Sequence, residues 1–115
     1  MSKRGDKEFL NDIVQSIERI EKYTDNMNYD TFLQDIKTQD AVLRNLEIIG
    51  EAAKCLSKEL KLIHRNIKWK EISGMRDKVI HSYFGVKWDI VWSVIKNNLL
   101  ELKNKITTII TEIPI

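Results

Sequence analysis

The chain has 115 residues, enough for one domain and too few for two, so we expect residues 1–115 to form a single domain. Hydrophobic residues make up 43% and charged residues 31%, with one proline, which excludes a disordered or loop-rich chain. The formal net charge is only +2, yet residues 54–87 hold nine lysines and arginines against three aspartates and glutamates. This basic segment is either a surface for a polyanion or a solvated lysine-rich surface.

Composition also bears on location and cofactors. No apolar run approaches the roughly 20 residues that a membrane span needs, and the first residues do not have the pattern of a signal peptide. The lone Cys55 cannot form an internal disulfide, and with His64 and His81 it lacks metal-ligand spacing. We therefore expect a cytoplasmic protein with no membrane contact, metal or cofactor. We expect Cys55 itself to be a core or half-buried residue.

The first half of the chain predicts two long helices. The first covers residues 6–23, with Asp6 as its N-cap and a stripe of Phe9, Ile13, Ile17 and Ile20. A short helical piece at residues 29–35 follows. The second long helix covers residues 38–57, where Gly50 would let another helix approach closely.

The second half predicts shorter helices and then a long one. Residues 58–67 are expected to be a connection, followed by a helical turn anchored by Trp69 and Ile72. A helix over residues 75–83 would be closed by Gly85. The last helix covers residues 87–112, with Trp88 and Trp92 as packing residues. The whole pattern predicts an all-α, four- to five-helix up-down bundle.

Three charged residues of the second long helix stand at helical spacing. Arg44, Glu47 and Glu51 are separated by three, four and seven residues. Such a set is usually a surface ion-pair ladder. The alternative is a polar group that supports a nearby site or interface.

Residues 76–83 combine the groups that could carry chemistry. Arg76 is a permanent cation, His81 titrates near neutrality and Tyr83 supplies a phenol. In a helix, Asp77 would lie four residues before His81 and could orient its imidazole. Arg76 and His81 would be about 140° apart around the helix axis. A site built from both is therefore more easily completed across a dimer than within one chain.

This segment resembles the Arg-x4-His-x-Tyr motif of HepT-type HEPN proteins, the toxins paired with minimal nucleotidyltransferase (MNT) antitoxins. The similarity spans roughly residues 6–105. It is carried, besides the motif, by residues 29–33, 37–42, 44–54, 69–76 and 91–92. One departure is Asn66, which stands where the family pattern has a proline ahead of residues 67–69.

The resemblance implies a HEPN-like bundle that forms a homodimer with two motifs facing a shared cleft. It implies a metal-independent endoribonuclease toxin, with Arg76 and His81 catalytic. The spacing to His81 adds Asp77 as the residue that orients the imidazole. Arg44, Glu47 and Glu51 are candidates to support this site from the neighbouring helix. The MNT antitoxin would neutralise the toxin by complex formation, by AMPylation of Tyr83, or by both. Arg76 suits phosphate recognition and His81 suits acid–base work on RNA, whose 2′-hydroxyl is the nucleophile.

Two other classes of protein remain open from the sequence. A non-catalytic helical partner of a nucleotidyltransferase could bind a nucleotide or nucleic acid in a basic cleft without cutting it. The presence of both Arg76 and His81 argues against it, because a scaffold does not need the pair. A purely structural dimer is favoured only by the long apolar stripe of residues 91–113.

Overall fold

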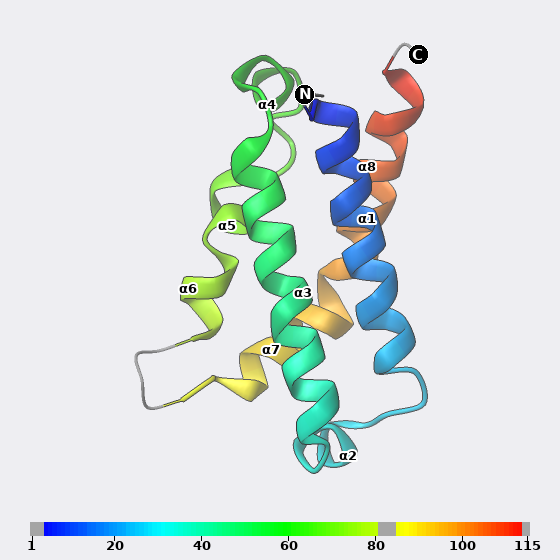
Figure 1. Cartoon of the computed structure of the whole chain (residues 1–115), viewed down its shortest axis with the longest axis vertical. Coiled ribbons are helices and arrows are strands. Elements are labelled where there is room, and N and C mark those ends of the chain that lie inside the picture. The colour runs from blue at the N-terminus through cyan, green and yellow to red at the C-terminus, as the bar shows by residue number, and fades with distance from the viewer. Residues whose placement is uncertain (1–3, 81–84, 114–115) are drawn as a thin grey trace.

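The computed structural model describes residues 4–80 and 85–113, which fold into a helical bundle of four alternating passes (Figure 1). The predicted all-α up-down bundle is confirmed. The third pass is made of two short helices, and the fourth is interrupted once. In chain order the helices are α1 (Asp6–Tyr23), α2 (Tyr29–Leu33), α3 (Ile36–Cys55), α4 (Lys58–Ile63), α5 (Trp69–Ser73), α6 (Met75–Val79), α7 (Trp88–Asn97) and α8 (Leu99–Glu112).

The core lies between the long helices. The predicted stripe of α1 is buried at Ile13, Ile17 and Ile20, opposite Leu46 and Ile49 of α3. Each of these side chains contributes about 1.5–3 kcal/mol when it is removed from water. The stripe therefore holds α1 and α3 side by side, and the rest of the bundle is built against this pair.

Asp6 does not cap α1, contrary to the prediction. Gly5 takes the N-cap position, and its N–H donates to the Glu8 carboxylate at 2.9 Å. The carboxylate of Asp6 instead accepts two hydrogen bonds from Ser57, from the backbone N–H at 2.8 Å and from the hydroxyl at 2.6 Å. Asp6 thus ties the start of α1 to the start of α4, 51 residues away.

The second long helix is confirmed, with its start two residues earlier than expected. Asp35 caps it by accepting a hydrogen bond from the Thr38 N–H at 3.0 Å. Gly50 lies where α3 meets α5: an added Cβ would be 3.2 Å from the Ser73 carbonyl oxygen. The close approach predicted for Gly50 is therefore real. Cys55, in contrast, is exposed, so its predicted burial is wrong.

Both tryptophans of α7 pack against α2, as predicted. The Phe32 ring centroid is 5.1 Å from that of Trp92 and 5.7 Å from that of Trp88. Tyr29 lies 6.2 Å from Trp92 between ring centroids. The ammonium of Lys96 lies over the Trp92 ring, 4.7 Å from its centroid. These contacts fix α2 beneath the bundle and occupy the rings in packing.

The segment after α3 and the last predicted helix both differ from the sequence prediction. Residues 58–67 are not only a connection, because Ser57 caps α4 by accepting from the Leu60 N–H at 3.2 Å. The last helix is broken at Asn98, whose φ of −120° and ψ of −36° leave the helical region. The bundle therefore has a gap in its fourth pass that the apolar repeat alone does not reveal.

The helix expected over residues 75–83 ends at Val79. Ile80 is extended (φ −102°, ψ 113°) and pairs with Val86 in an antiparallel bridge. The Lys87 N–H donates to the Val79 carbonyl at 2.8 Å. Gly85, the residue before Val86, has a φ of +150° and does not close a helix, contrary to the prediction.

Among the described helices, none is long and apolar enough to cross a membrane.

Candidate functional site

Arg76 lies on the exposed side of α6, facing α3. Its side chain is 55% exposed; its Nε is 3.8 Å from Glu47 Oε2 and its Nη1 is 3.8 Å from Asp77 Oδ1. Both distances exceed those of good hydrogen bonds, so the carboxylates hold the guanidinium only loosely. Its N–H groups remain available to a phosphate, which a planar guanidinium can bind through two oxygens.

The local fold explains why Arg76 points outward. Met75 and Val79 are the buried positions of α6, four residues apart, and they anchor the helix to the core. Arg76, Asp77 and Lys78 fall between them and are exposed. Because Gly50 lets α5 lie against α3, the next helix begins close enough for Arg76 to reach Glu47.

Five predicted residues of α3 and α6 form the group that we call the Arg76 corner: Arg44, Glu47, Glu51, Arg76 and Asp77. Glu47 joins its two parts, because it faces Arg76 of α6 and, with Arg44 and Glu51, lines a shallow groove of about 260 Å³ that also includes Phe9 and Asp12 of α1. The expected ion-pair ladder does not form, since no ion pair joins Arg44 to either glutamate in the described structure. Glu51 pairs with Lys54 at 3.6 Å, whereas Glu47 faces Arg76.

His81 and Tyr83 lie outside the described residues. Their neighbours in sequence, Ile80 and Val86, are paired at the end of α6. Because Ile80 is extended, the helical spacing that placed Asp77 beside His81 and separated Arg76 from His81 by about 140° does not apply. The roles of His81 and Tyr83 remain predictions on the basis of the motif.

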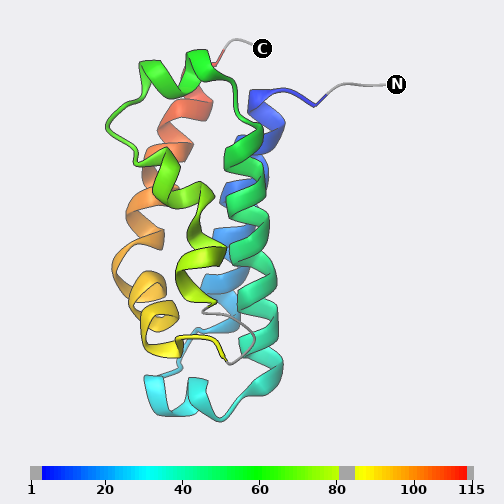
Figure 2. The same ribbon diagram turned by 90° about the vertical axis from the view of Figure 1, so that its left-hand side faces the viewer.

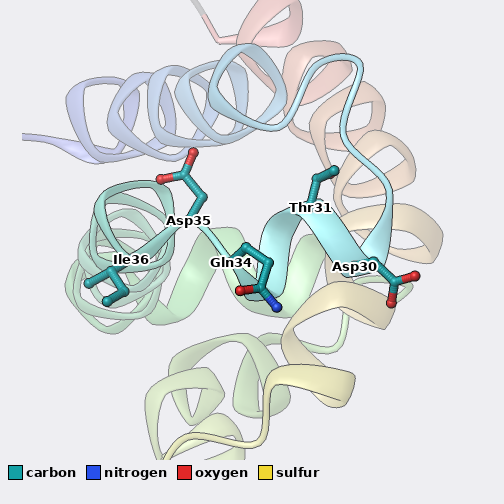
Figure 3. Close-up of a pocket in the computed structure, with 5 residues that line it drawn as sticks. All are labelled: Asp30, Thr31, Gln34, Asp35 and Ile36. Carbon is teal, nitrogen blue, oxygen red and sulfur yellow. The ribbon is translucent and has the colours of Figure 1, made fainter.

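Another hollow lies at the turn from α2 into α3. It has a volume of about 480 Å³ and is lined by the residues that we call the acidic corner: Asp30, Thr31, Gln34, Asp35 and Ile36. Figure 3 shows these side chains pointing in different directions instead of converging. Hydrogen bonds from the backbone and hydroxyl of Thr38 hold the pKa of Asp35 below its ordinary value. A charged carboxylate here would repel a phosphodiester.

A metal site was not expected from the sequence. Within residues 4–80 and 85–113, no three His, Cys, Asp or Glu side chains gather closely enough to hold a metal ion. The Arg76 corner places a cation between two carboxylates, and the guanidinium of Arg76 can bind an anion.

The sequence of the chain matches a known family of proteins. A family model described as "Ribonuclease HepT-like" matches residues 13–109, most of the chain. The chain belongs to the HepT-like ribonuclease family of HEPN proteins.

Relatives with curated names agree with this family. A Thermococcus cleftensis protein named "Probable ribonuclease HepT" is 47% identical over 103 residues, 90% of this chain and 94% of the relative. A Methanocaldococcus jannaschii protein named "Putative RNase" is 42% identical over 113 residues, 98% of this chain and 93% of its own length. One from Caldanaerobacter subterraneus, also named "Putative RNase", is 40% identical over 102 residues, covering 89% and 91%. No solved structure matches this chain.

Proposed function

We propose that this chain is a metal-independent endoribonuclease that cuts RNA at a site built from Arg76 and His81. The observation that carries the proposal is the exposed, loosely paired guanidinium of Arg76 at the start of the motif. Membership of a ribonuclease family supports RNA as the substrate. The basic segment 54–87 favours the approach of a polyanion.

The chemistry needs only groups that the motif contains. The 2′-oxygen of RNA attacks the adjacent phosphorus while a base removes its proton, and the bond from phosphorus to the 5′-oxygen breaks. An acid then protonates the leaving 5′-oxygen, which gives a 2′,3′-cyclic phosphate and a 5′-hydroxyl. His81 suits either proton transfer because its ordinary pKa lies near neutrality. Arg76 would stabilise the charge that develops on the phosphate.

The carboxylates of the Arg76 corner act on Arg76 in this proposal. Glu47 and Asp77 each lie 3.8 Å from a guanidinium nitrogen, on different atoms of the group. Two weak ion pairs restrict the rotamers of a long side chain without neutralising it fully. We therefore assign Glu47 and Asp77 as positioning residues, with Arg44 and Glu51 further along the same face of α3.

A homodimer through the outer face of α1 and α3 would bring two such sites together. This face carries both Arg44 and Glu51 and the half-buried apolar residues Phe9 and Ile48 around one groove. Charges of both signs on one patch are self-complementary in a two-fold contact. Cys55, the chain's single cysteine, lines the same groove and provides a probe.

The dimer is tested by light scattering and by labelling Cys55 with a thiol reagent. We expect a dimer whose Cys55 reacts more slowly as protein concentration rises, and Glu51→Arg should shift the equilibrium toward monomer through like-charge repulsion. A chain that stays monomeric at all concentrations, or a labelling rate independent of concentration, would contradict this dimer.

We further propose that the protein is the toxin of a cytoplasmic HEPN/MNT toxin–antitoxin pair, as the family motif implies. AMP attached to Tyr83 would add bulk and a negative phosphodiester two residues from His81 and so repel RNA. Incubation with the cognate nucleotidyltransferase and ATP should add the mass of one AMP and abolish RNA cleavage, but not with Tyr83→Phe. If inhibition of Tyr83→Phe is unchanged, the antitoxin acts by binding alone.

RNA cleavage in the presence of a chelator tests the enzymatic proposal. The parent chain should cut RNA with EDTA present, and His81→Ala should reduce the rate by at least about 100-fold. A parent chain that binds RNA but never cuts it would instead establish the non-catalytic binding module. Equal cleavage by parent and His81→Ala would overturn the catalytic assignment.

A further inference from the structure

A third hollow is lined by residues of α5, α6, α7 and α8 and of the segment just before α5. The short helices α5 and α6 lie beside α7 and α8 (Figure 2). The hollow has a volume of about 300 Å³, at the lower limit for sites that hold small organic ligands. Three lysines line it: Lys68 at the N-cap of α5, Lys78 of α6 and Lys105 of α8. We call this surface the lysine groove.

The floor of the lysine groove is apolar and reaches the core. Ile72, Met75 and Leu102 line it and retain 8%, 8% and 9% of their exposure, whereas much of the core is fully covered. Asn98, at the break between α7 and α8, also lines the lysine groove. The interrupted fourth pass and two helices of five residues each therefore leave this part of the core open.

The rim of the lysine groove carries more positive than negative charge. Its carboxylates are Glu71 and Glu101, and Glu101 is paired with Lys105 at 3.1 Å. In the described structure no carboxylate forms an ion pair with Lys68 or Lys78. Two ammonium groups are thus free to bind an anion at the mouth of an apolar hollow.

The rim also provides groups that can form directional hydrogen bonds. Asn66 and Asn98 are exposed, and both line the groove. Each side-chain amide offers both donors and an acceptor. A matching ligand would place a flat apolar ring on the floor of the groove. The polar edges of the ring would face the two amides, and an anionic group would face the lysines.

We propose that the lysine groove binds one nucleotide unit of the RNA substrate, with its base on the floor and its phosphate at Lys68 and Lys78. This proposal rests on the proposed RNA cleavage and adds where the strand runs. Lys78 follows Arg76 by two residues on α6, so the two side chains leave opposite sides of one short helix. An RNA strand held at Arg76 would cross the exposed side of α6 to reach the groove.

The first test compares two triple substitutions of basic residues in a His81→Ala background, where RNA stays intact. The groove variant replaces Lys68, Lys78 and Lys105 with Ala. The matched control replaces with Ala the exposed residues Arg19, Lys22 and Lys37, which lie outside both the groove and the basic segment 54–87. Both lose three charges, and an exposed ion pair such as that of Lys105 adds little stability. Circular dichroism melts confirm that both variants fold.

Binding of a fluorescent RNA hexamer is then measured by anisotropy at several salt concentrations. The groove variant should bind at least about tenfold more weakly, and the slope of log affinity against log salt should fall by about two. The control should change affinity by less than about threefold. Equal loss in both variants would mean that only overall charge matters and would overturn the proposal.

A second measurement separates a nucleotide within RNA from a free nucleotide or a bare phosphate. Amide NMR shifts of Ile72, Met75 and Leu102 are followed on addition of the hexamer, AMP or inorganic phosphate. Shifts with the hexamer that vanish in the groove variant support the proposal. Shifts with AMP or phosphate alone, and none with the hexamer, overturn it.

Cleavage assays on the same lysine substitutions, with His81 retained, distinguish this proposal from the proposed function. A parent chain that cuts RNA while the groove variant cuts it with unchanged KM contradicts only the groove assignment. A parent chain that cuts no RNA contradicts the ribonuclease assignment, whatever the groove binds. We expect the groove variant to raise KM at least about tenfold, with a smaller change in kcat.

Discussion

The acidic corner, at the turn from α2 into α3, and the Arg76 corner, on α3 and α6, differ in size and in the charged groups that they present. The acidic corner surrounds a hollow of about 480 Å³, against about 260 Å³ for the groove beside Glu47. Its charged side chains are Asp30 and Asp35, and Ile36 beside them is 71% exposed. The groove beside Glu47 is also lined by carboxylates, but Glu47 in addition faces the guanidinium of Arg76, which is held by two weak ion pairs.

The comparison shows that an exposed, loosely paired guanidinium, and not the volume of a hollow, identifies the surface for a phosphodiester. A carboxylate-lined hollow repels a phosphate at short range, while an incompletely paired guanidinium attracts it. The carboxylate of Asp35 is also already used, because it accepts the hydrogen bond that starts α3. The acidic corner is thus explained as a helix start, and the Arg76 corner retains binding capacity.

The largest effect on RNA cleavage should appear when one substitution in each corner is compared. Arg76→Ala should lower kcat/KM for RNA cleavage by at least about 100-fold, because the developing charge on the phosphate loses its main donor. Asp30→Ala, at the acidic corner, should leave kcat/KM within about twofold. Initial rates on one labelled RNA measure both; similar rates for the two variants would remove the distinction between the corners.

Displacement of α5 tests whether the Arg76 corner depends on the packing of Gly50. In Gly50→Val, the first added carbon would already lie 3.2 Å from the Ser73 carbonyl oxygen, so α5 and the following α6 must shift. We expect a loss of about 1–3 kcal/mol in the free energy of unfolding. Cleavage should also fall, with a smaller loss of both in Gly50→Ala. Urea unfolding and cleavage are measured together, and full activity in Gly50→Val would contradict the dependence.

The tie between Asp6 and Ser57 should affect stability without affecting the site. Asp6→Ala removes two hydrogen bonds that join the starts of α1 and α4, which are at the end of the bundle away from α2 (Figure 1). The expected cost is about 1–2 kcal/mol in the free energy of unfolding. A double-mutant cycle with Ser57→Ala isolates the pair, and additive losses would show that the two residues are not coupled.

The smallest effect should be that of pH on the free energy of unfolding, through Asp35 at the acidic corner. The pKa of Asp35 lies below its ordinary value of 3.8, so the unfolded chain takes up a proton first as pH falls. The stabilisation by Asp35 is therefore present above pH 3.8 and is lost below it as pH falls through the folded-state pKa. Melts at pH 5 and pH 2 should show a smaller loss for Asp35→Asn than for the parent. An equal loss would contradict the capping role.

The sequence predicted the long helices well because their packing is periodic. The bounds of α1 match, and the stripe that includes Ile13 and Ile17 is buried as expected. It could not predict the break at Asn98, since the apolar positions continue in register on both sides. It also extended the helix beyond Val79, because the pairing of Ile80 with Val86 is a tertiary contact without a local signal.

The candidate site was predictable in residue type and only partly in geometry. Arg76 and Asp77 were identified from the motif, and Glu47 from its spacing on α3. The contact between Arg76 and Glu47 joins residues 29 positions apart in the sequence. It depends on the close approach of α5 to α3, for which Gly50 was the indication in the sequence. The lysine groove was indicated only in part, because Lys68 and Lys78 belong to the basic segment 54–87 but meet Lys105 only when α5 and α6 lie against α8.

The most direct test of the central claim is the chemistry of the RNA ends produced by the purified chain with EDTA present. The account predicts cleavage within the RNA that leaves 2′,3′-cyclic phosphate and 5′-hydroxyl ends, and that is lost in both Arg76→Ala and His81→Ala. Absence of cleavage by the parent, cleavage that stops on chelation, or ends with a 5′-phosphate would contradict it.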